Sequence, residues 1–340
     1  MALPHPYYNN PPAYMGFVGF VKLRTGNVVG TTQVDSNYSH GEMIVRATSA
    51  DINLSQDITK TDVIDSRYDR TVYQLGPKLI EGSFSFPAVY DEQGGANIVE
   101  ALYRYAITRN TSGGLSPFNL DVKYAASNSA PNVSDFLYSG NIVNTWTFNV
   151  SNEDLVNITV DMIGLTRDYN ESTIIPAADL TNTRAVTWND ARVEIAGGRI
   201  ANTIGGQFVR TFEASVANNA ERFYTLNKNL FPQAVAPTKR DVTGNIALLG
   251  RHQDLANLAL SNENYCSESV QVKFGFETKA TGTGCTSTFG VTVPNCIFQI
   301  EEMSLSNDIF ETRVDWHSLP AAGTGINDPL ISNLGAAFTY

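Results

Sequence analysis

The sequence has little of what most catalytic and metal sites require. Its four histidines, at positions 5, 40, 252 and 317, have no second histidine, cysteine or acidic residue at ligand spacing. It has no Gly-x-Ser-x-Gly nucleophile turn and no catalytic cysteine signature. Glu301 and Glu302 are adjacent, and adjacent strand residues point to opposite faces, so they cannot act as a carboxylate pair. We therefore expect no enzyme activity, no metal and no cofactor.

Cysteine is scarce as well. The three cysteines, Cys266, Cys285 and Cys296, are odd in number and have no CxxC spacing, which makes a poor disulfide framework and a poor zinc site. Free thiols in a reducing compartment are the favoured interpretation. A Cys285–Cys296 pair stays open.

Long apolar runs and basic clusters are also missing. No run approaches the roughly 18 apolar residues of a membrane helix, and the start MALPHPYYNNPPAYMG lacks the features of a signal peptide. The sequence therefore predicts neither membrane insertion nor secretion. The net charge of −11 argues against binding nucleic acid through phosphate contacts, which needs clustered Lys and Arg. An acidic protein can still let DNA pass without holding it.

A strand pattern is present, and it occurs twice. Phe208–Val216 and Asp241–Leu249 alternate apolar and polar residues, and between them lies a segment rich in Asn and Pro that predicts a long loop. Gly41–Ala88 has the same layout of strand, polar loop and strand, with Gly82 in the position of Gly244. Long loops of this kind are usually functional or are ordered by a neighbour.

The order of elements downstream also repeats. After each glycine-bearing strand comes a segment with helical periodicity, then a strand, then a pair of strands. These segments are 96–108, Asn119–Tyr124 and Ile142–Ile163 in the first half, and the region of Leu255, Val270–Phe276 and Ile297–Trp316 in the second. The repeat predicts two similar domains in tandem. We place an N-terminal arm at 1–15, a first domain at 16–167, a linker at 168–187, a second domain at 188–322 and a C-terminal tail at 323–340.

Two runs carry a family resemblance. Ala220–Leu249, in the layout NNAERFYTLN…P…KRDVTGNIALL, and Ser55–Pro87 resemble the tail tube proteins of tailed bacteriophages and other tailed viruses, in particular those with two tube domains in tandem. The resemblance implies a mainly β fold of two tandem β-sandwich or split-barrel domains, each with one flanking helix. Each domain would contribute four strands to a ring-shaped β-barrel.

The same resemblance implies a structural virion protein without enzyme activity, assembled in the host cytoplasm and located in the virion tail. Three chains would form a ring with pseudo-sixfold symmetry, and six chains are the alternative if only one domain of each chain lines the lumen. Stacked rings would form the channel for genome ejection. Implied partners are further copies of the chain, the tape measure, baseplate and terminator proteins, the sheath where a tail has one, and genomic DNA that passes without specific binding. No membrane partner is implied. The competing interpretation is a carbohydrate- or receptor-binding β-sandwich of the virion.

Two groups of residues are expected to act in such an assembly. The long loops would contact neighbouring subunits through Asp62, Asp65, Arg67, Asp69, Arg70, Arg222, Lys228, Lys239 and Arg240. For the first loop the alternative is a solvated cluster of local ion pairs. The hairpins Ile142–Ile163 and Ile297–Trp316 would line the bore, with acidic groups that repel DNA phosphates. These acids are Glu153, Asp154, Asp161, Glu301, Glu302 and Asp308.

Overall fold

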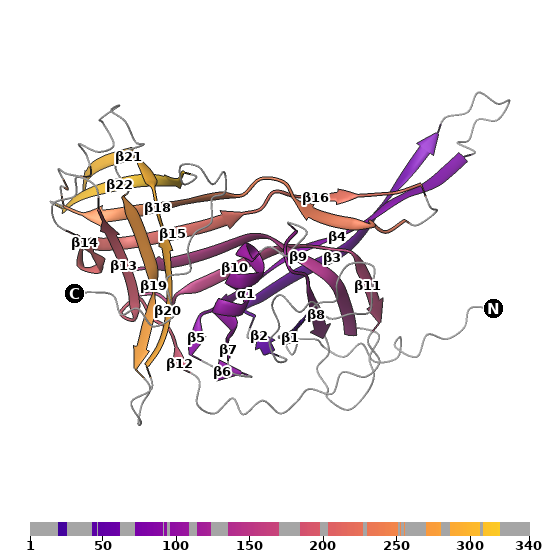
Figure 1. Cartoon of the computed structure of the whole chain (residues 1–340), viewed down its shortest axis with the longest axis horizontal. Helices are drawn as coiled ribbons and strands as arrows, with labels where there is room; N and C mark the ends of the chain where they lie inside the picture. The colour runs from indigo at the N-terminus through magenta and orange to yellow at the C-terminus, as the bar shows by residue number, and fades with distance from the viewer. Residues whose placement is uncertain are drawn as a thin grey trace.

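The chain folds mainly into antiparallel strands (Figure 1). The computed structural model describes residues 20–25, 43–45, 47–61, 72–90, 92–93, 96–108, 114–123, 135–169, 184–197, 203–226, 230–250, 252, 255, 270–279, 286–306 and 309–319. Within these residues one helix is complete, α1 (Ile98–Ile107). The mainly β fold class is confirmed. No helix in the described part of the chain is long and apolar enough to cross a membrane.

Eight strands form what we call the main sheet. Its order is β3-β4-β10-β9-β15-β18-β22-β21, and every neighbouring pair is antiparallel. The bounds are β3 (Ser49–Thr61), β4 (Val72–Pro87), β10 (Asn157–Gly164), β9 (Asp135–Ser151), β15 (Val209–Ala217), β18 (Asp241–Leu249), β22 (Ile309–Ser318) and β21 (Cys296–Ser306). The first four strands come from the first half of the chain and the last four from the second.

The two groups of four strands have the same internal order. Each group begins with a hairpin, β3–β4 in the first and β15–β18 in the second. The second strand of the hairpin then pairs with the group's last strand in sequence, β10 or β22. Gly82 lies opposite Ile52 and Met162, and Gly244 lies opposite Ala214 and Trp316. The repeat predicted from element order is therefore present in the strand pairing. The halves meet where β9 pairs with β15, which we call the internal joint.

The core lies against one face of the main sheet, under a second layer. In the first half this layer contains α1 and the strands β1 (Phe20–Thr25), β2 (Met43–Val45) and β8 (Phe118–Lys123). In the second half it is the sheet β14-β13-β19-β20. The bounds are β14 (Ile204–Gly205), β13 (Ala191–Ala196), β19 (Gln271–Lys279) and β20 (Thr286–Val293).

The core is continuous across the internal joint. The ring of Phe274, on β19 of the second half, lies 6.5 Å from that of Trp146 and 5.3 Å from that of Phe148, both on β9 of the first half. Tyr103 of α1 contacts the same Trp146 at 4.9 Å and Phe289 of β20 at 5.7 Å. Aromatic rings bury large areas, so these contacts hold the two halves together.

The predicted long loops are partly wrong, because strands occupy part of each segment. β3 and β4 pair as far as Thr61 and Val72, and the segment after β15 contains the ladder of β16 (Ala220–Phe223) with β17 (Ala234–Pro237). Asn and Pro suggested a structureless backbone, but here they lie at ladder ends. Asn219, at φ 47°, occupies the left-handed region that Asn tolerates, and Pro237 ends an edge strand.

The remaining elements are short. They are β5 (Val89–Tyr90), β6 (Glu92–Gln93), β7 (Ala96–Asn97), β11 (Thr166–Tyr169), β12 (Arg184–Ala185) and the 3₁₀ turn η2 (Gly206–Phe208). β11 and β12 lie at the two ends of the predicted linker, and the domain boundaries stay a prediction. Of the second predicted helix, Leu255 is described, and it is helical. The predicted N-terminal arm and C-terminal tail lie outside the described residues.

Candidate functional site: the polar face of the main sheet

The main sheet has one apolar face and one polar face. On β10, Ile158, Val160 and Met162 are buried in the core, while Thr159 and Asp161 between them are only partly buried. Because strand side chains alternate between faces, the residues between the core positions share the opposite face. The same alternation runs through the neighbouring strands, so the polar face spans both halves of the chain.

Rows of short polar side chains cross this face. One row takes a residue from each of six adjacent strands: Ser85, Thr159, Thr147, Ser215, Thr243 and His317. Hydroxyl groups within it are neighbours, since Ser85 Oγ lies 2.9 Å from Thr159 Oγ1. The row beside it is Asn157, Asn149, Glu213, Asn245, Asp315 and Gln299. Its carboxylate Glu213 accepts from the side-chain amides of Asn149 and Asn245 at 3.4 and 3.5 Å.

Acidic residues outnumber basic ones on the polar face. By strand register the acids are Asp51, Glu81, Asp161, Glu213, Asp241, Glu302, Glu311 and Asp315. The basic residues at such positions are Arg313 and His317. Burial raises the pKa of Asp161 above its ordinary value. At this surface, then, the sheet presents negative charge among neutral hydroxyl and amide groups.

One acid at the end of the sheet is held by two arginines. Glu311, at the start of β22, is 9% exposed, and its carboxylate lies 2.7 Å from Arg210 Nη1 and 3.2 Å from Arg313 Nε. Burial alone would raise the pKa of Glu311, but the hydrogen bonds and charges of Arg313 and Arg210 outweigh burial and lower it. The group therefore stabilises this end of the sheet in its ionised form.

Exposed apolar side chains gather at the two ends of the main sheet. β4 pairs with β10 as far as Ile80, and beyond that point β3 and β4 continue as a hairpin, which we call the β3–β4 extension. Near its base the backbone N–H of Lys78 donates to the carbonyl oxygen of Leu230 at 2.8 Å. It projects from the body of the molecule (Figure 1). Ile58 and Leu75 face each other on it, and each is 56% exposed. The exposed Phe223, Tyr224 and Leu226 lie at the same end of the sheet, on and after β16.

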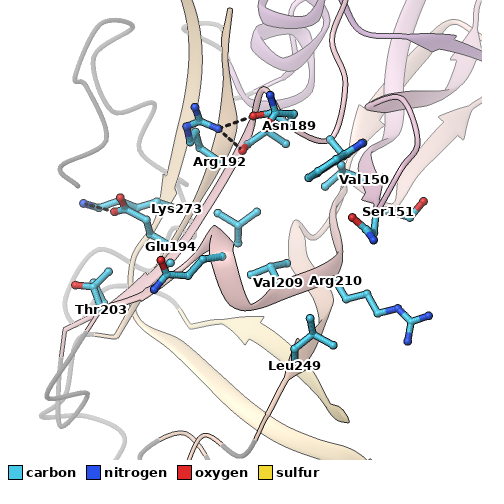
Figure 2. Close-up of a pocket in the computed structure, with 17 residues that line it drawn as sticks. Val150, Ser151, Asn189, Arg192, Glu194, Thr203, Val209, Arg210, Leu249 and Lys273 are labelled. Atoms are coloured by element: carbon cyan, nitrogen blue, oxygen red, sulfur yellow. Dashed lines mark hydrogen bonds and ion pairs between the residues drawn. The ribbon is translucent and has the colours of Figure 1, made fainter. Parts of the chain in front are cut away.

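The opposite end has a cavity of about 1010 Å³ (Figure 2). One side is lined by Val150, Val209 and Leu249, from the ends of β9, β15 and β18. The other side is lined by Arg192 and Glu194 of β13 and by Lys273 of β19, in the second layer. The exposed side chains of this end are Leu155, Trp188, Phe208 and Leu249. Every large exposed apolar side chain in the described part of the chain thus belongs to one end or the other.

The residues predicted for subunit contacts have different surroundings. Arg222 pairs with Glu81 at 2.9 Å, and Lys239 pairs with Asp241 at 2.8 Å on the surface. Arg240 is only 5% exposed and donates to atoms of its own chain, so its side chain is not available for a contact between subunits. The others, Asp62, Asp65, Arg67, Asp69, Arg70 and Lys228, lie outside the described residues.

The predicted bore acids also differ from one another. Asp161 lies on the polar face, while Glu153 and Asp154 are exposed in the turn between β9 and β10, at the end of the sheet. Glu301 and Glu302 belong to β21, where Glu302 lies opposite Arg313 in the strand register with β22. Asp308 lies outside the described residues. Asp51, Glu81 and Glu213 lie on the polar face but outside the two predicted hairpins, and Asp315 lies on it within the second hairpin, although it was not among the predicted acids. Alternating polar residues on β3 and β15 were the available signal.

Reactive groups are few in the described part of the chain. It contains no cluster of three or more His, Cys, Asp or Glu residues placed to hold a metal ion. Cys296 is a buried free thiol, and burial raises its pKa to about 12. A thiol with this pKa stays protonated near neutral pH and is a poor nucleophile.

A broad antiparallel sheet with one covered apolar face and one polar face is common among antiparallel β proteins, so the fold alone does not give the function. The comparison with protein families identifies it, because the model of the phage tail tube protein family matches residues 11–331. The chain belongs to this family. It is therefore a structural tail tube protein of the virion, which favours the tube over a carbohydrate- or receptor-binding sandwich. Among curated proteins, no sequence matches.

Proposed function

We propose that three copies of this chain close into a ring whose polar face lines the bore, and that stacked rings form the channel through which the viral genome is ejected. The observation that carries the proposal is the arrangement of the main sheet. Two groups of four strands, in the same order, continue one another through the internal joint. The same step repeated between chains generates a closed ring.

The open edges of the sheet support closure. Among the described residues, β3 pairs only with β4, and β21 pairs only with β22. Unpaired edges invite uncontrolled association, and closing a barrel removes them. Three chains of eight strands give a barrel of about 24 strands, wider than the barrels of about 16–18 strands that already hold an aqueous channel. Six chains would give the same number only if one group of four strands per chain lined the bore. The pairing of β9 with β15 keeps both groups in one sheet, which favours the three-chain ring.

The chemistry of the polar face suits the passage of DNA. Acids such as Asp161, Glu213 and Asp315 repel phosphate groups, and short hydroxyl and amide side chains offer no cluster of cations that could hold a strand. A bore of this kind passes DNA without specific binding.

The ends of the sheet suit stacking. The β3–β4 extension presents Ile58 and Leu75 at one end, and the cavity beside Trp188 and Leu249 lies at the other. Apolar groups exposed at opposite ends can cover each other when rings stack head to tail. In sequence Asp62, Asp65, Arg67, Asp69 and Arg70 lie between the two strands of the extension, so they stay predicted contact residues, together with Arg222, Lys228 and Lys239. Tape measure, baseplate, terminator and sheath proteins would meet the ends or the outside of this tube, which would assemble in the host cytoplasm.

Negative-stain electron microscopy of the purified protein tests the proposal. We expect rings or hollow filaments with three chains per ring, and a density map with Asp161, Glu213 and Asp315 facing the bore. Filaments in which these residues face outward would refute the assignment of the polar face. Discrete particles at all concentrations, even with the other tail proteins present, would refute self-assembly.

A further inference from the structure

We propose that β21 of one chain pairs antiparallel with β3 of the next chain, in the register that β9 and β15 have at the internal joint. This inference rests on the proposed ring and adds the strands, the direction and the residue pairs of the contact between chains. Its basis is the correspondence between the two groups of four strands, which fixes each position from backbone pairing.

The first correspondence relates β3 to β15. Gly82 and Gly244 occupy the same place in their hairpins, and so do their partners Ile52 and Ala214. Both differ by 162 positions (244 − 82 and 214 − 52). The positions of Glu213 and Ala217 on β15 therefore correspond to Asp51 and Ser55 on β3.

The second correspondence relates β9 to β21 through their shared partners. Met162 and Trp316 lie opposite the two glycines and differ by 154 positions (316 − 162). The same offset relates Asn157 to Glu311. Because Asn157 pairs with Asn149 on β9, and Glu311 pairs with Ser304 on β21, Asn149 corresponds to Ser304.

A second position on these strands follows in the same way. Asp161 pairs with Thr145 on β9, and Asp315, at the same offset, pairs with Gln299 on β21. Thr145 therefore corresponds to Gln299. Asn149 and Thr145 are four positions apart but Ser304 and Gln299 are five, because β21 has a bulge between Ile300 and Glu302.

The contact between chains follows when each residue of the internal joint is replaced by its equivalent in the other half. At the internal joint Glu213 pairs with Asn149, and Ala217 pairs with Thr145. The equivalent pairs between chains are Asp51 with Ser304 and Ser55 with Gln299. A slip of one residue would turn the apolar residues of β3 toward the polar face, so the register is strongly specified.

The burial of β3 agrees with a strand that gains a partner. Its core-face residues Ala50 and Leu54 are partly buried in the single chain, while their equivalents at the internal joint, Phe212 and Val216, are each 1% exposed. On the other edge Cys296 and Phe298 of β21 are buried, while Ile297 between them is only partly buried and Gln299 after them is exposed, as a strand with one core face requires. Pairing β21 with β3 would cover the remaining apolar area.

A polar pair beside the joint gives a further match. Asn218 and Arg240 lie one position beyond the Ala217–Asp241 pair, where the ladder of β15 with β18 ends. Both are buried, and Arg240 Nε donates to Asn218 Oδ1 at 3.1 Å. The equivalent positions in the first half are Gln56 and Lys78, which pair in the register of β3 with β4. Both halves thus place an amide and a cation side by side where the hairpin leaves the sheet.

Engineered disulfides test the register. In a background of Cys266→Ser and Cys285→Ser, with the buried Cys296 kept, the variant Asp51→Cys/Ser304→Cys is assembled under reducing conditions, checked by electron microscopy and then oxidised. Opposite residues of antiparallel strands have Cα atoms about 4.5–5.5 Å apart, within the range that a disulfide spans. We expect covalent dimers and trimers on a non-reducing gel, with no larger species. A second variant, Ser55→Cys/Gln299→Cys, is expected to give the same ladder.

The matched control is Asp51→Cys/Ser306→Cys, which is shifted by two positions along the strand. We expect it to cross-link at least tenfold more slowly, and each single-cysteine variant to stay monomeric on the gel. Tubes that form normally while neither designed pair cross-links would overturn the register and leave the tube function intact. A ladder that continues to six chains would overturn the three-chain ring. If the parent protein forms no rings at all, the proposed function itself fails.

Discussion

Arg240 Nη2 donates to the carbonyl oxygen of Ile107 at 2.9 Å, so a cation from the second half of the chain meets the last turn of the helix in the first half. Asn218 Nδ2 donates to the carbonyl oxygens of Ala106 and Val143 at 2.9 and 3.1 Å. Carbonyl groups at a helix C-terminus lack partners within the helix and carry partial negative charge. The two side chains satisfy them inside the protein and thereby fix the halves at the internal joint.

Arg240→Ala is expected to lower the free energy of unfolding by about 2–3 kcal/mol, because buried acceptors lose a charged donor. Chemical denaturation of the dispersed subunit measures this. Lys239→Ala is the matched control, since the Lys239 side chain is 78% exposed and its surface pair with Asp241 is worth about 0–1 kcal/mol at most. Equal losses in the two variants would contradict the role assigned to Arg240.

Gly244→Ala is expected to destabilise the subunit by about 1–3 kcal/mol. A Cβ at this position would meet the carbonyl oxygen of Glu213 and the indole ring of Trp316 on the neighbouring strands. Gly205→Ala serves as the control, because nothing lies within 4 Å of a Cβ there. Thermal denaturation compares the two variants. A Gly244→Ala protein as stable as its parent would show that the sheet tolerates the added methyl group.

Asp161→Asn is expected to stabilise the isolated subunit at pH 7. Burial raises the pKa of Asp161 in the folded state above its ordinary value, so folding disfavours its ionised form. The stability linked to its proton is present at low pH and is lost as the pH rises through the folded-state pKa. The gain from the substitution should therefore vanish in acid.

Melting temperatures of parent and Asp161→Asn subunits across pH 3–7 test this dependence. Asp51→Asn, at an exposed position of the same face, should change the melting temperature little at any pH. A gain for Asp161→Asn that persists unchanged at pH 3 would have a cause other than ionisation.

Charge reversal on the polar face should make assembled tubes retain DNA. Asp315→Lys adds a cation to the bore in every chain, and repeated cations release counterions from DNA on binding. We expect DNA to bind at least tenfold more tightly than to parent tubes at low salt, and to dissociate as salt rises. Fluorescence anisotropy with a short labelled duplex measures it. Glu221→Lys makes the same acid-to-lysine change at an exposed position of β16, away from the polar face, and should have a much smaller effect on DNA binding.

Ring stacking should depend on different residues at the two ends. Ile58→Asp/Leu75→Asp alters the β3–β4 extension, and Trp188→Asp alters the cavity end, while the strand edges that close the ring stay unchanged. Each variant alone is expected to form single rings without tubes. A mixture should give paired rings and nothing longer, because each partner supplies one intact end. Electron microscopy counts them, and long tubes from either variant alone would refute this stacking contact.

Sequence patterns predicted the local elements well. β18 has the bounds read from the alternation of Asp241–Leu249, and α1 falls within 96–108, because periodicity reports burial directly. The internal joint could not be predicted in this way. It pairs Asn149 with Glu213, which are far apart in the chain and share no local pattern. For the same reason no local pattern places Glu213 on a polar face shared with the first half. The ladder of β16 with β17 is local, but it lies in a segment whose Asn and Pro content predicts a loop.

The equivalent pairs Asn218–Arg240 and Gln56–Lys78 both join an amide and a cation, but their contacts differ. Arg240 donates to Asn218, whereas Gln56 donates to the carbonyl oxygen of Gly76 and Lys78 lies over the ring of Phe231. A ring of three such chains would look nearly sixfold to any partner that senses only the backbone, and threefold to one that senses side chains. A protein docking on the end of the tube could thus match either symmetry, depending on which features it contacts. Duplication within a single chain therefore provides one surface on which threefold and sixfold components of a virion could both be mounted.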